Sequence, residues 1–164
     1  MILKNCEIWY AKLNPKRPSS RLNKENPTWE VQLRTTDKEV KKDWESKNLP
    51  VRAVVPDADD QEPYYRVNLR KKSIKKDGSN AEPPELIDGK GAPVDPDTIG
   101  NGSVANIRIY QYEYDATGGK KGIASILMAV QMVKHILFDP TKGREEFEEF
   151  ETEVVQEKTS EEEF

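Results

Sequence analysis

The sequence of 164 residues predicts a mainly β protein, a small barrel with one helix and an acidic C-terminal tail. Three observations lead to this prediction. Polar and apolar residues alternate over several short segments, as they do in half-buried strands. A single segment combines a helix-capping signal with apolar residues at helical spacing. The last twenty residues are dominated by glutamate, a composition typical of disordered or mobile segments.

The predicted strands are short and separated by turn residues. In 28–34, three apolar residues share one face and the polar residues between them share the other. The same alternation occurs in 64–74 and is clearest in 103–114. A further strand is predicted at 5–13, and 51–55 is expected to be a short apolar strand or a connector. Five or more strands with so little helix favour a small barrel.

The helix is predicted from Thr36 to about Lys47. Thr36 and Glu39 have the spacing of a capping box, which marks a helix N-terminus. Val40 and Trp44 then lie on one side of the helix and can face the core.

The segment 123–138 is open to two interpretations. Its length and its Ala, Leu and Met content suit a helix. The preceding turn, 116–122, contains a Gly-Gly pair that favours a hairpin, and therefore a strand. Segment 77–102 is rich in glycine and proline and is expected to be a loop, with brief pairing at 85–88. Loops of that length are usually functional or mobile.

The charge is divided unevenly along the chain. Residues 145–164 contain ten acids and one base, a net charge of −9. Because the whole chain carries −4, residues 1–144 carry +5. We therefore expect a basic domain over 1–144 and an acidic tail over 145–164. A basic body with an acidic tail suggests binding to a polyanion.

Several protein classes are disfavoured. The longest apolar run is interrupted by polar residues and makes a poor membrane span. No secretory signal is visible, so an intracellular protein is expected. Cys6 is the only cysteine, which excludes an internal disulfide and a multi-cysteine zinc site. His135 lies in an apolar segment, as a packed or edge residue would, and no metal or nucleotide cofactor is expected.

Enzyme signatures are weak. The sequence has no glycine-rich phosphate loop and no Gly-x-Ser-x-Gly elbow. Asp57, Asp59 and Asp60 could bind Mg²⁺ in a nuclease, but acids in a proline-bounded loop are more often simply solvated. A non-catalytic protein is therefore expected.

The strongest candidate binding surface is the predicted strand 103–114. Alternation places four side chains on one face, about 7 Å apart, where the rings can stack on unpaired bases. These residues are Arg108, Tyr110, Tyr112 and Tyr114. The alternative is that the rings are buried while the isoleucines face solvent, or that they form only a cross-strand aromatic ladder.

Basic residues elsewhere are expected to support the same surface by contacting phosphates. The polar face of 64–74 and the hairpin turn supply Tyr64, Arg66, Arg70, Lys72, Lys120 and Lys121. The basic loop 14–27 could contact phosphates as well, or could simply be a solvated loop.

The end of the tail is a candidate partner-binding motif. Glu161, Glu162, Glu163 and Phe164 join negative charge, a ring and an α-carboxylate. That combination can dock into an apolar pocket rimmed by basic residues. The tail charge could also occupy the basic groove and compete with phosphates, or Phe164 could be a chance terminal residue.

These features together resemble the replication single-stranded DNA-binding proteins of short-tailed, lytic phages of the podovirus type. The resemblance rests on the strand 29–33 before the helix, the glycine-bearing strand entry 97–104, the aromatic strand 107–114, the hairpin into 122–138, and the acidic tail ending in phenylalanine.

The resemblance implies a five-stranded Greek-key OB-fold barrel, and it implies that 123–138 is a strand. It also implies sequence-independent binding to single-stranded DNA in phage replication and recombination in the host cytoplasm, and often a homodimer. The tail is implied to contact the phage DNA polymerase and the helicase-primase, with Phe164 as its terminal aromatic residue. Strand annealing is a plausible accompanying activity. The alternative is a protein-interaction or virion-associated β-domain that binds no nucleic acid.

Overall fold

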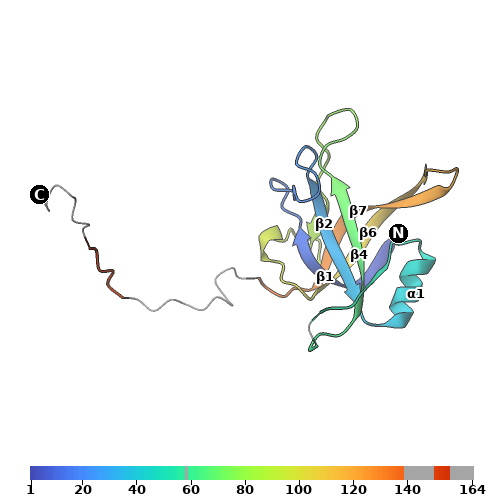
Figure 1. Ribbon diagram of the computed structural model, residues 1–164. Helices are drawn as coiled ribbons and strands as arrows, with labels where there is room; N and C mark the ends of the chain where they lie inside the picture. The colour runs from blue at the N-terminus through green and yellow to red at the C-terminus, as the bar shows by residue number, and fades with distance from the viewer. Residues whose placement is uncertain (58, 139–149, 156–164) are drawn as a thin grey trace, which may run out of the picture.

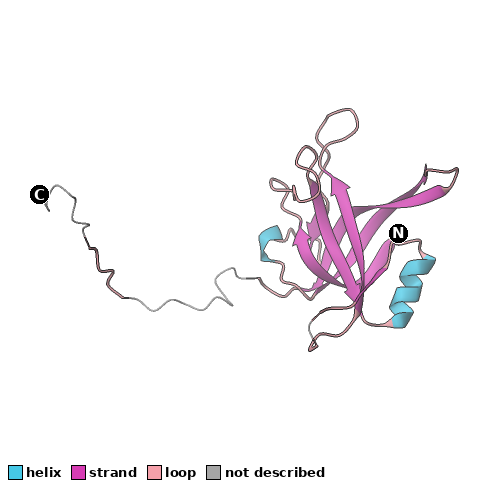
Figure 2. Cartoon of the chain, in the orientation of Figure 1, coloured by secondary structure: helices cyan, strands magenta, loops and turns pink. Residues whose placement is uncertain are grey.

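The computed structural model describes residues 1–57, 59–138 and 150–155 of the chain, and strands dominate it (Figures 1 and 2). The strands are β1 (Ile2–Lys12), β2 (Thr28–Thr35), β3 (Arg52–Val54), β4 (Tyr64–Lys72), β5 (Glu85–Ile87), β6 (Ser103–Asp115) and β7 (Lys121–Lys134). The helices are α1 (Lys38–Ser46) and a 3-10 turn, η1 (Pro96–Thr98).

Five of the strands close into a barrel. The sheet order is β3-β4-β2-β1-β6-β7-β5, and β4 also pairs with β7 in parallel. This pairing joins the two halves of the sheet, so the ring runs β1-β2-β4-β7-β6 and returns to β1. The short strands β3 and β5 extend the sheet beside β4 and β7. The arrangement is that of a small OB fold, as predicted.

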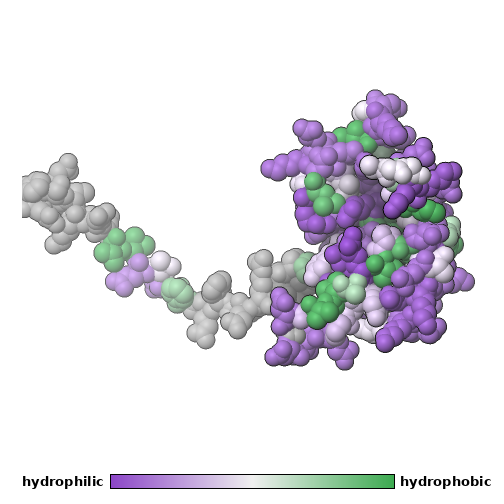
Figure 3. All heavy atoms as spheres, turned by 45° about the vertical axis from the view of Figure 1, so that its right-hand side comes forward, coloured by the Kyte–Doolittle hydropathy of each residue, from purple (hydrophilic) through white to green (hydrophobic). Residues whose placement is uncertain are grey.

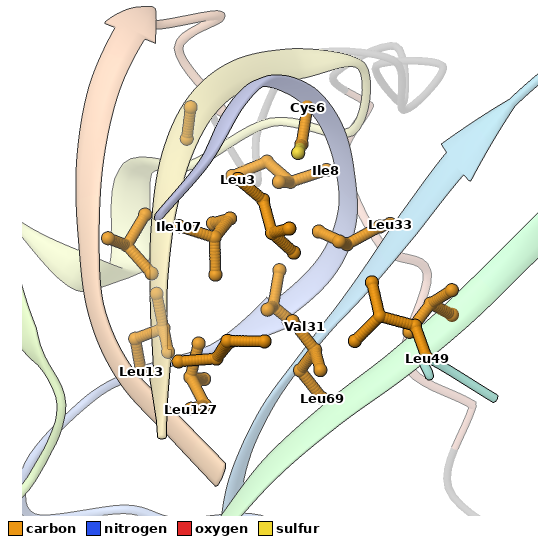
Figure 4. Packing of buried hydrophobic residues seen from close by; sticks show 14 of the residues in the cluster. Leu3, Cys6, Ile8, Leu13, Val31, Leu33, Leu49, Leu69, Ile107 and Leu127 are labelled. Carbon is orange, nitrogen blue, oxygen red and sulfur yellow. The ribbon is translucent and has the colours of Figure 1, made fainter. Parts of the chain in front are cut away.

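The barrel interior is apolar and is supplied by every strand of the ring. Leu3 and Ile8 of β1, Leu33 of β2, Ile107 of β6 and Leu127 of β7 are all buried, and their side chains converge (Figure 4). Cys6 lies in the same core. Burial raises the pKa of its thiol to about 12, so Cys6 stays protonated at neutral pH and packs as a small apolar side chain.

Helix α1 lies at one end of the barrel (Figure 1) and places Trp44 in the core. The helix was predicted correctly, but its cap was not. Asp37, rather than Thr36, is the N-cap, and its carboxylate accepts a hydrogen bond from the backbone N–H of Glu39 at 2.8 Å. Thr35 in turn accepts from the Asp37 N–H, which leaves the helix to begin one residue later than the capping box suggested.

The segment 123–138 is a strand for most of its length, as the resemblance implied. It forms a long hairpin with β6 that projects from the barrel (Figure 1). Gly118 and Gly119 in the turn have φ of 84° and 75°, values that glycine adopts without steric cost. Gly122 lies opposite Tyr114, and a Cβ there would overlap the tyrosine ring.

The predicted loop 77–102 contains more structure than its composition indicates. β5 lies inside it, as the brief pairing at 85–88 predicted, and η1 follows. Its C-terminal end is anchored by Ser103, which is fully buried. The Ser103 hydroxyl donates to Gly100 O at 2.7 Å and accepts from the Ile136 N–H at 3.0 Å. His135 is an edge residue whose Nε2 lies 3.0 Å from Thr98 O.

No helix in the described part of the chain is long and apolar enough to span a membrane. Of the predicted tail, only 150–155 is described, and Glu161, Glu162, Glu163 and Phe164 lie outside the described residues.

Replacing Ser103 by alanine is expected to lower the free energy of unfolding by about 1–3 kcal/mol, because the Ile136 N–H loses its acceptor and the Gly100 carbonyl keeps only the longer bond from the Ser103 N–H at 3.3 Å. Urea unfolding followed by circular dichroism measures the change. Ser46→Ala, which removes an exposed hydroxyl from α1, is the control and should change stability by no more than about 0.5 kcal/mol. Equal losses in the two variants would contradict the anchoring role of Ser103.

Candidate nucleic-acid interface

The outward face of β4 carries the polar residues that alternation predicted. Val67 and Leu69 are buried in the core, so Arg66, Asn68 and Arg70 point away from it. Neither arginine forms an ion pair with any residue that the structure describes. Both arginines are half-buried, and the Arg70 Nε is itself buried without a hydrogen-bond partner, so their charges are free of ion pairs within the described part of the chain.

The sheet register places three arginines side by side on this face. Arg34 of β2 pairs with Arg66 of β4, which pairs with Arg52 of β3. Directly opposed residues on neighbouring strands have Cβ atoms about 5 Å apart, and like charges at that distance destabilise a sheet. We call Arg34, Arg66 and Arg52 the arginine row. An external polyanion would relieve its repulsion.

An aromatic cluster surrounds the first arginine of the row. The Arg34 Cζ lies 4.0 Å from the ring centroid of Trp9, 4.3 Å from that of Tyr64 and 5.3 Å from that of Tyr10. Arg34 Nε also donates to the side-chain oxygen of Gln32 at 2.7 Å. We call Trp9, Tyr10 and Tyr64 the aromatic cluster. It provides flat apolar surface beside positive charge, as single-stranded nucleic acid requires.

A β-bulge in β1 makes the cluster possible. Consecutive residues of a regular strand point to opposite faces, yet Trp9 and Tyr10 both contact Arg34. The register with β2 shifts between Trp9 and Lys12, and Tyr10 has φ of 52°, in the left-handed region. The Tyr10 N–H donates to the side-chain oxygen of Asn101 at 2.8 Å, which holds the bulge. The bulge thus directs both rings outward.

A groove of about 390 Å³ continues from Tyr10 across β1, β2 and β4. Its lining includes four basic side chains, those of Lys12, Arg21, Arg66 and Arg70. The one acid in the lining, Glu30, is ion-paired with Arg21 at 3.2 Å. The basic loop 14–27 therefore contributes to the groove through Arg21. The groove can accept a negatively charged backbone.

The tyrosines of β6 face solvent, as predicted. Ile107 and Ile109 are buried, whereas Tyr110, Tyr112 and Tyr114 are 58%, 43% and 48% exposed. The rings of Tyr110 and Tyr112 stack on each other with centroids 6.3 Å apart. The alternative in which the rings fill the core is thereby excluded, and the rings are accessible.

The β6 tyrosines and the β4 arginines were expected to support one surface, and in the structure β7 lies between their strands. Arg70 pairs with Ile126 of β7, and Ile126 pairs with Tyr110 of β6. The three residues form one row across the outside of the barrel, with two strand spacings, about 10 Å, between the backbones of Arg70 and Tyr110. The two sets are therefore neighbouring patches around the barrel.

The remaining cations predicted to bind DNA are not among the residues that line the groove, and two of them are paired with carboxylates. Arg108 forms an ion pair with Glu85 at 3.5 Å. Lys121 pairs with Asp115 in the hairpin and so lies on the face opposite Tyr114, where it contacts Glu113 at 3.8 Å. Lys120 lies in the hairpin turn. Lys72 is exposed at the end of β4.

Among the described residues, no three histidine, cysteine, aspartate or glutamate side chains lie close enough together to hold a metal ion. Asp57, Asp59 and Asp60 are within this part of the chain and form no such group.

No protein-family model matches the chain, and no curated protein sequence matches it. Solved structures do match. The single-stranded DNA-binding protein from bacteriophage Enc34 in complex with ssDNA superposes with a TM-score of 0.55 at 14% identity, covering 82% of this chain and 86% of that one. A second Enc34 structure gives 0.53 at 13%, covering 87% and 86%. The gp2.5 single-stranded DNA-binding protein of bacteriophage T7 gives 0.48 at 16%, covering 90% and 96%.

The chain has the fold of phage single-stranded DNA-binding proteins. This agrees with the resemblance noted in the sequence.

Sequence reasoning found Tyr64 but missed its partners. Trp9, Tyr10 and Arg34 were not predicted as site residues, since strict alternation separates Trp9 from Tyr10 and says nothing of which strands are neighbours. The one sequence signal was the presence of two large aromatic residues, Trp9 and Tyr10, in succession on the first strand.

Replacing Tyr10 by glycine and by alanine distinguishes the effect of its backbone conformation on stability from the effect of its ring. Because φ is positive, Tyr10→Gly is expected to be more stable than Tyr10→Ala by about 1 kcal/mol, measured by urea unfolding. The ring itself is 55% exposed, so its loss should cost little stability in either variant. If the alanine variant is the more stable, Tyr10 does not occupy the left-handed region.

Proposed function

We propose that the chain is a non-catalytic single-stranded DNA-binding protein of phage replication, with its binding domain over 1–144. The observation that carries the proposal is the arginine row beside the aromatic cluster. Fold likeness to phage single-stranded DNA-binding proteins supports it but at 14% identity shows the fold alone.

The charge pattern favours a polyanion over a small anion. Arg34, Arg66 and Arg52 extend across three strands, and the groove lining adds Arg70 and Lys12. Neighbouring strands are about 4.8 Å apart, so these cations are spread over a length that several successive phosphates would match. A single phosphate could contact only part of the set.

The aromatic side chains favour a single strand over a duplex. Bases in a duplex are stacked on each other and offer no open face, whereas unpaired bases can stack on protein rings. Trp9, Tyr10 and Tyr64 lie at one end of the groove. Tyr110, Tyr112 and Tyr114 lie beyond Arg70, where a strand leaving the groove would continue across β7.

The predicted cations have unequal roles in this proposal. Arg66, Arg70 and Lys72 contact phosphates along β4, and Lys120 does so from the hairpin turn. Arg108 and Lys121 already face carboxylates and would have to exchange these for phosphates.

The acidic tail, 145–164, is proposed to act in two ways. Its charge of −9 competes with DNA for the groove. Its end, Glu161 to Glu163 with Phe164, recruits replication proteins, with the phage DNA polymerase and helicase-primase as the partners that the resemblance implies. Strand annealing in recombination and homodimer formation belong to the same proposal.

The proposal predicts salt-sensitive binding to a fluorescein-labelled dT oligomer, followed by anisotropy, and much weaker binding to a duplex of equal length. Arg66→Ala should reduce the magnitude of the slope of log K against log salt by about 0.7, the value for one lost contact to a single strand. It should not reduce stability, because a like charge is removed from the row.

Lys42→Ala is the matched control, since it removes the same charge from the exposed surface of α1. Its salt slope should equal that of the wild type. If the wild-type protein does not bind the oligomer, a protein-interaction or virion-associated domain becomes the better interpretation. If the oligomer is degraded only when Mg²⁺ is present, the protein is a nuclease.

Removing 145–164 is expected to strengthen binding to the dT oligomer at low salt, because the deletion removes a competing charge of −9. The gain should shrink as salt is raised. A full-length variant with all ten acids of the tail replaced by glutamine serves as the control and should show the same gain. Unchanged or weaker binding in both variants would contradict competition by the tail.

A further inference from the structure

Arg34 occupies a slot between two aromatic rings. β2 lies between β1 and β4 in the sheet, so Trp9 of β1 and Tyr64 of β4 approach Arg34 from opposite sides. The guanidinium carbon is 4.0 Å from one ring centroid and 4.3 Å from the other, and the two centroids are therefore no more than 8.3 Å apart.

The upper limit of 8.3 Å on the separation of the two ring centroids is wide enough for one nucleobase. A base between two rings makes a van der Waals contact of about 3.5 Å on each side, which requires rings about 7 Å apart. A guanidinium is planar, as a base is, and it stacks on aromatic faces in the same way. Arg34 thus fills a space that a flat aromatic ligand could take.

The slot opens into a second cavity, of about 520 Å³, on the side of the sheet toward α1. Trp9, Arg34 and Tyr64 all line it, together with the polar residues Glu7 and Thr35. Glu7 accepts a hydrogen bond from the Trp9 indole N–H at 2.7 Å and so fixes the orientation of the ring. The cavity gives an entering base room for its edge and offers polar groups to it.

We propose that Arg34 is a place-holder for a single unpaired nucleobase, which inserts between Trp9 and Tyr64 and displaces the guanidinium. The displaced guanidinium remains on the phosphate side of the slot, beside Arg66 in the arginine row. Its charge is then used twice, first to keep the two rings apart and then to bind the DNA backbone. This inference rests on the proposed function and adds a base site to it.

Tryptophan fluorescence reports directly on the slot. Trp29 and Trp44 are each only 3% exposed, although Trp44 also lines the cavity, whereas Trp9 is partly exposed and forms one wall of the slot. A dT oligomer should therefore quench the emission of the wild-type protein. An abasic oligomer of equal length, which supplies phosphates without bases, should bind without this quenching. Trp9→Phe should abolish the quenching while Trp29 and Trp44 remain.

The affinity for the dT oligomer tests the side of the slot that Tyr64 forms. Tyr64→Ala is expected to weaken binding by about 5- to 150-fold, the range for loss of one base–ring contact. Tyr64→Phe should bind as the wild type does, because stacking does not need the hydroxyl. Circular dichroism confirms that each variant is folded.

Arg34→Met and Arg66→Met distinguish a place-holder from a fixed platform. Both variants lose one charge and keep an unbranched stem. If Arg34 must be displaced, its replacement should weaken binding less than that of Arg66. If a base instead stacks on a stationary guanidinium, Arg34→Met should be the more damaging, and this result would overturn the proposal.

The outcomes also separate this inference from the proposed function. Absence of binding to the dT oligomer by the wild-type protein would overturn both. Normal binding without quenching of Trp9, or with Tyr64→Ala equal to the Lys42→Ala control, would overturn the base slot alone.

Discussion

The antiparallel register of β2 with its two neighbours is the constraint on which the proposed site depends. Leu33 must face the core, and this places Arg34 outward. The register with β4 then sets Arg34 beside Arg66, although the repulsion between them costs stability. Stacking of Arg34 between aromatic rings offsets part of that cost. Glu7 of β1 lies directly opposite Arg34, but among the described residues no ion pair involves Arg34, Arg66 or Arg52. Their positive charge on the outside of the barrel is what a ligand with many phosphates can use.

The bulge in β1 is a departure from regular strand structure on the same face of the barrel. Tyr10 adopts a left-handed conformation that costs about 1–2 kcal/mol for a residue with a side chain. The barrel pairing that closes β1 against β6 holds this strain, with Asn101 accepting the Tyr10 N–H just before β6 begins. The strained residue carries an exposed ring that adds little to core packing. Its cost in stability therefore agrees with the proposed role of the ring in binding.

Much of the fold followed from local patterns, and much of the site did not. Alternation assigned the inward and outward residues of β4 and β6 correctly, because one face of each strand must be buried wherever the barrel closes. The capping residue of α1 was misplaced since Thr35, Thr36 and Asp37 are all able to cap. The aromatic cluster could not be predicted, because it requires a bulge and the strand order β1-β2-β4, and neither is visible in any one segment.

In the proposed function the two aromatic patches are successive points along one path of the DNA strand. The row Arg70, Ile126 and Tyr110 joins them across β7, and the outward side chain in the middle of the row is apolar and only partly buried. A single strand is flexible enough to follow such a curved surface, whereas a duplex is stiff over many times this length. The barrel surface seen in Figure 3 is mostly hydrophilic, with hydrophobic side chains in small separate spots. The curved path around the barrel is therefore a second reason, besides stacking, to expect a preference for single strands.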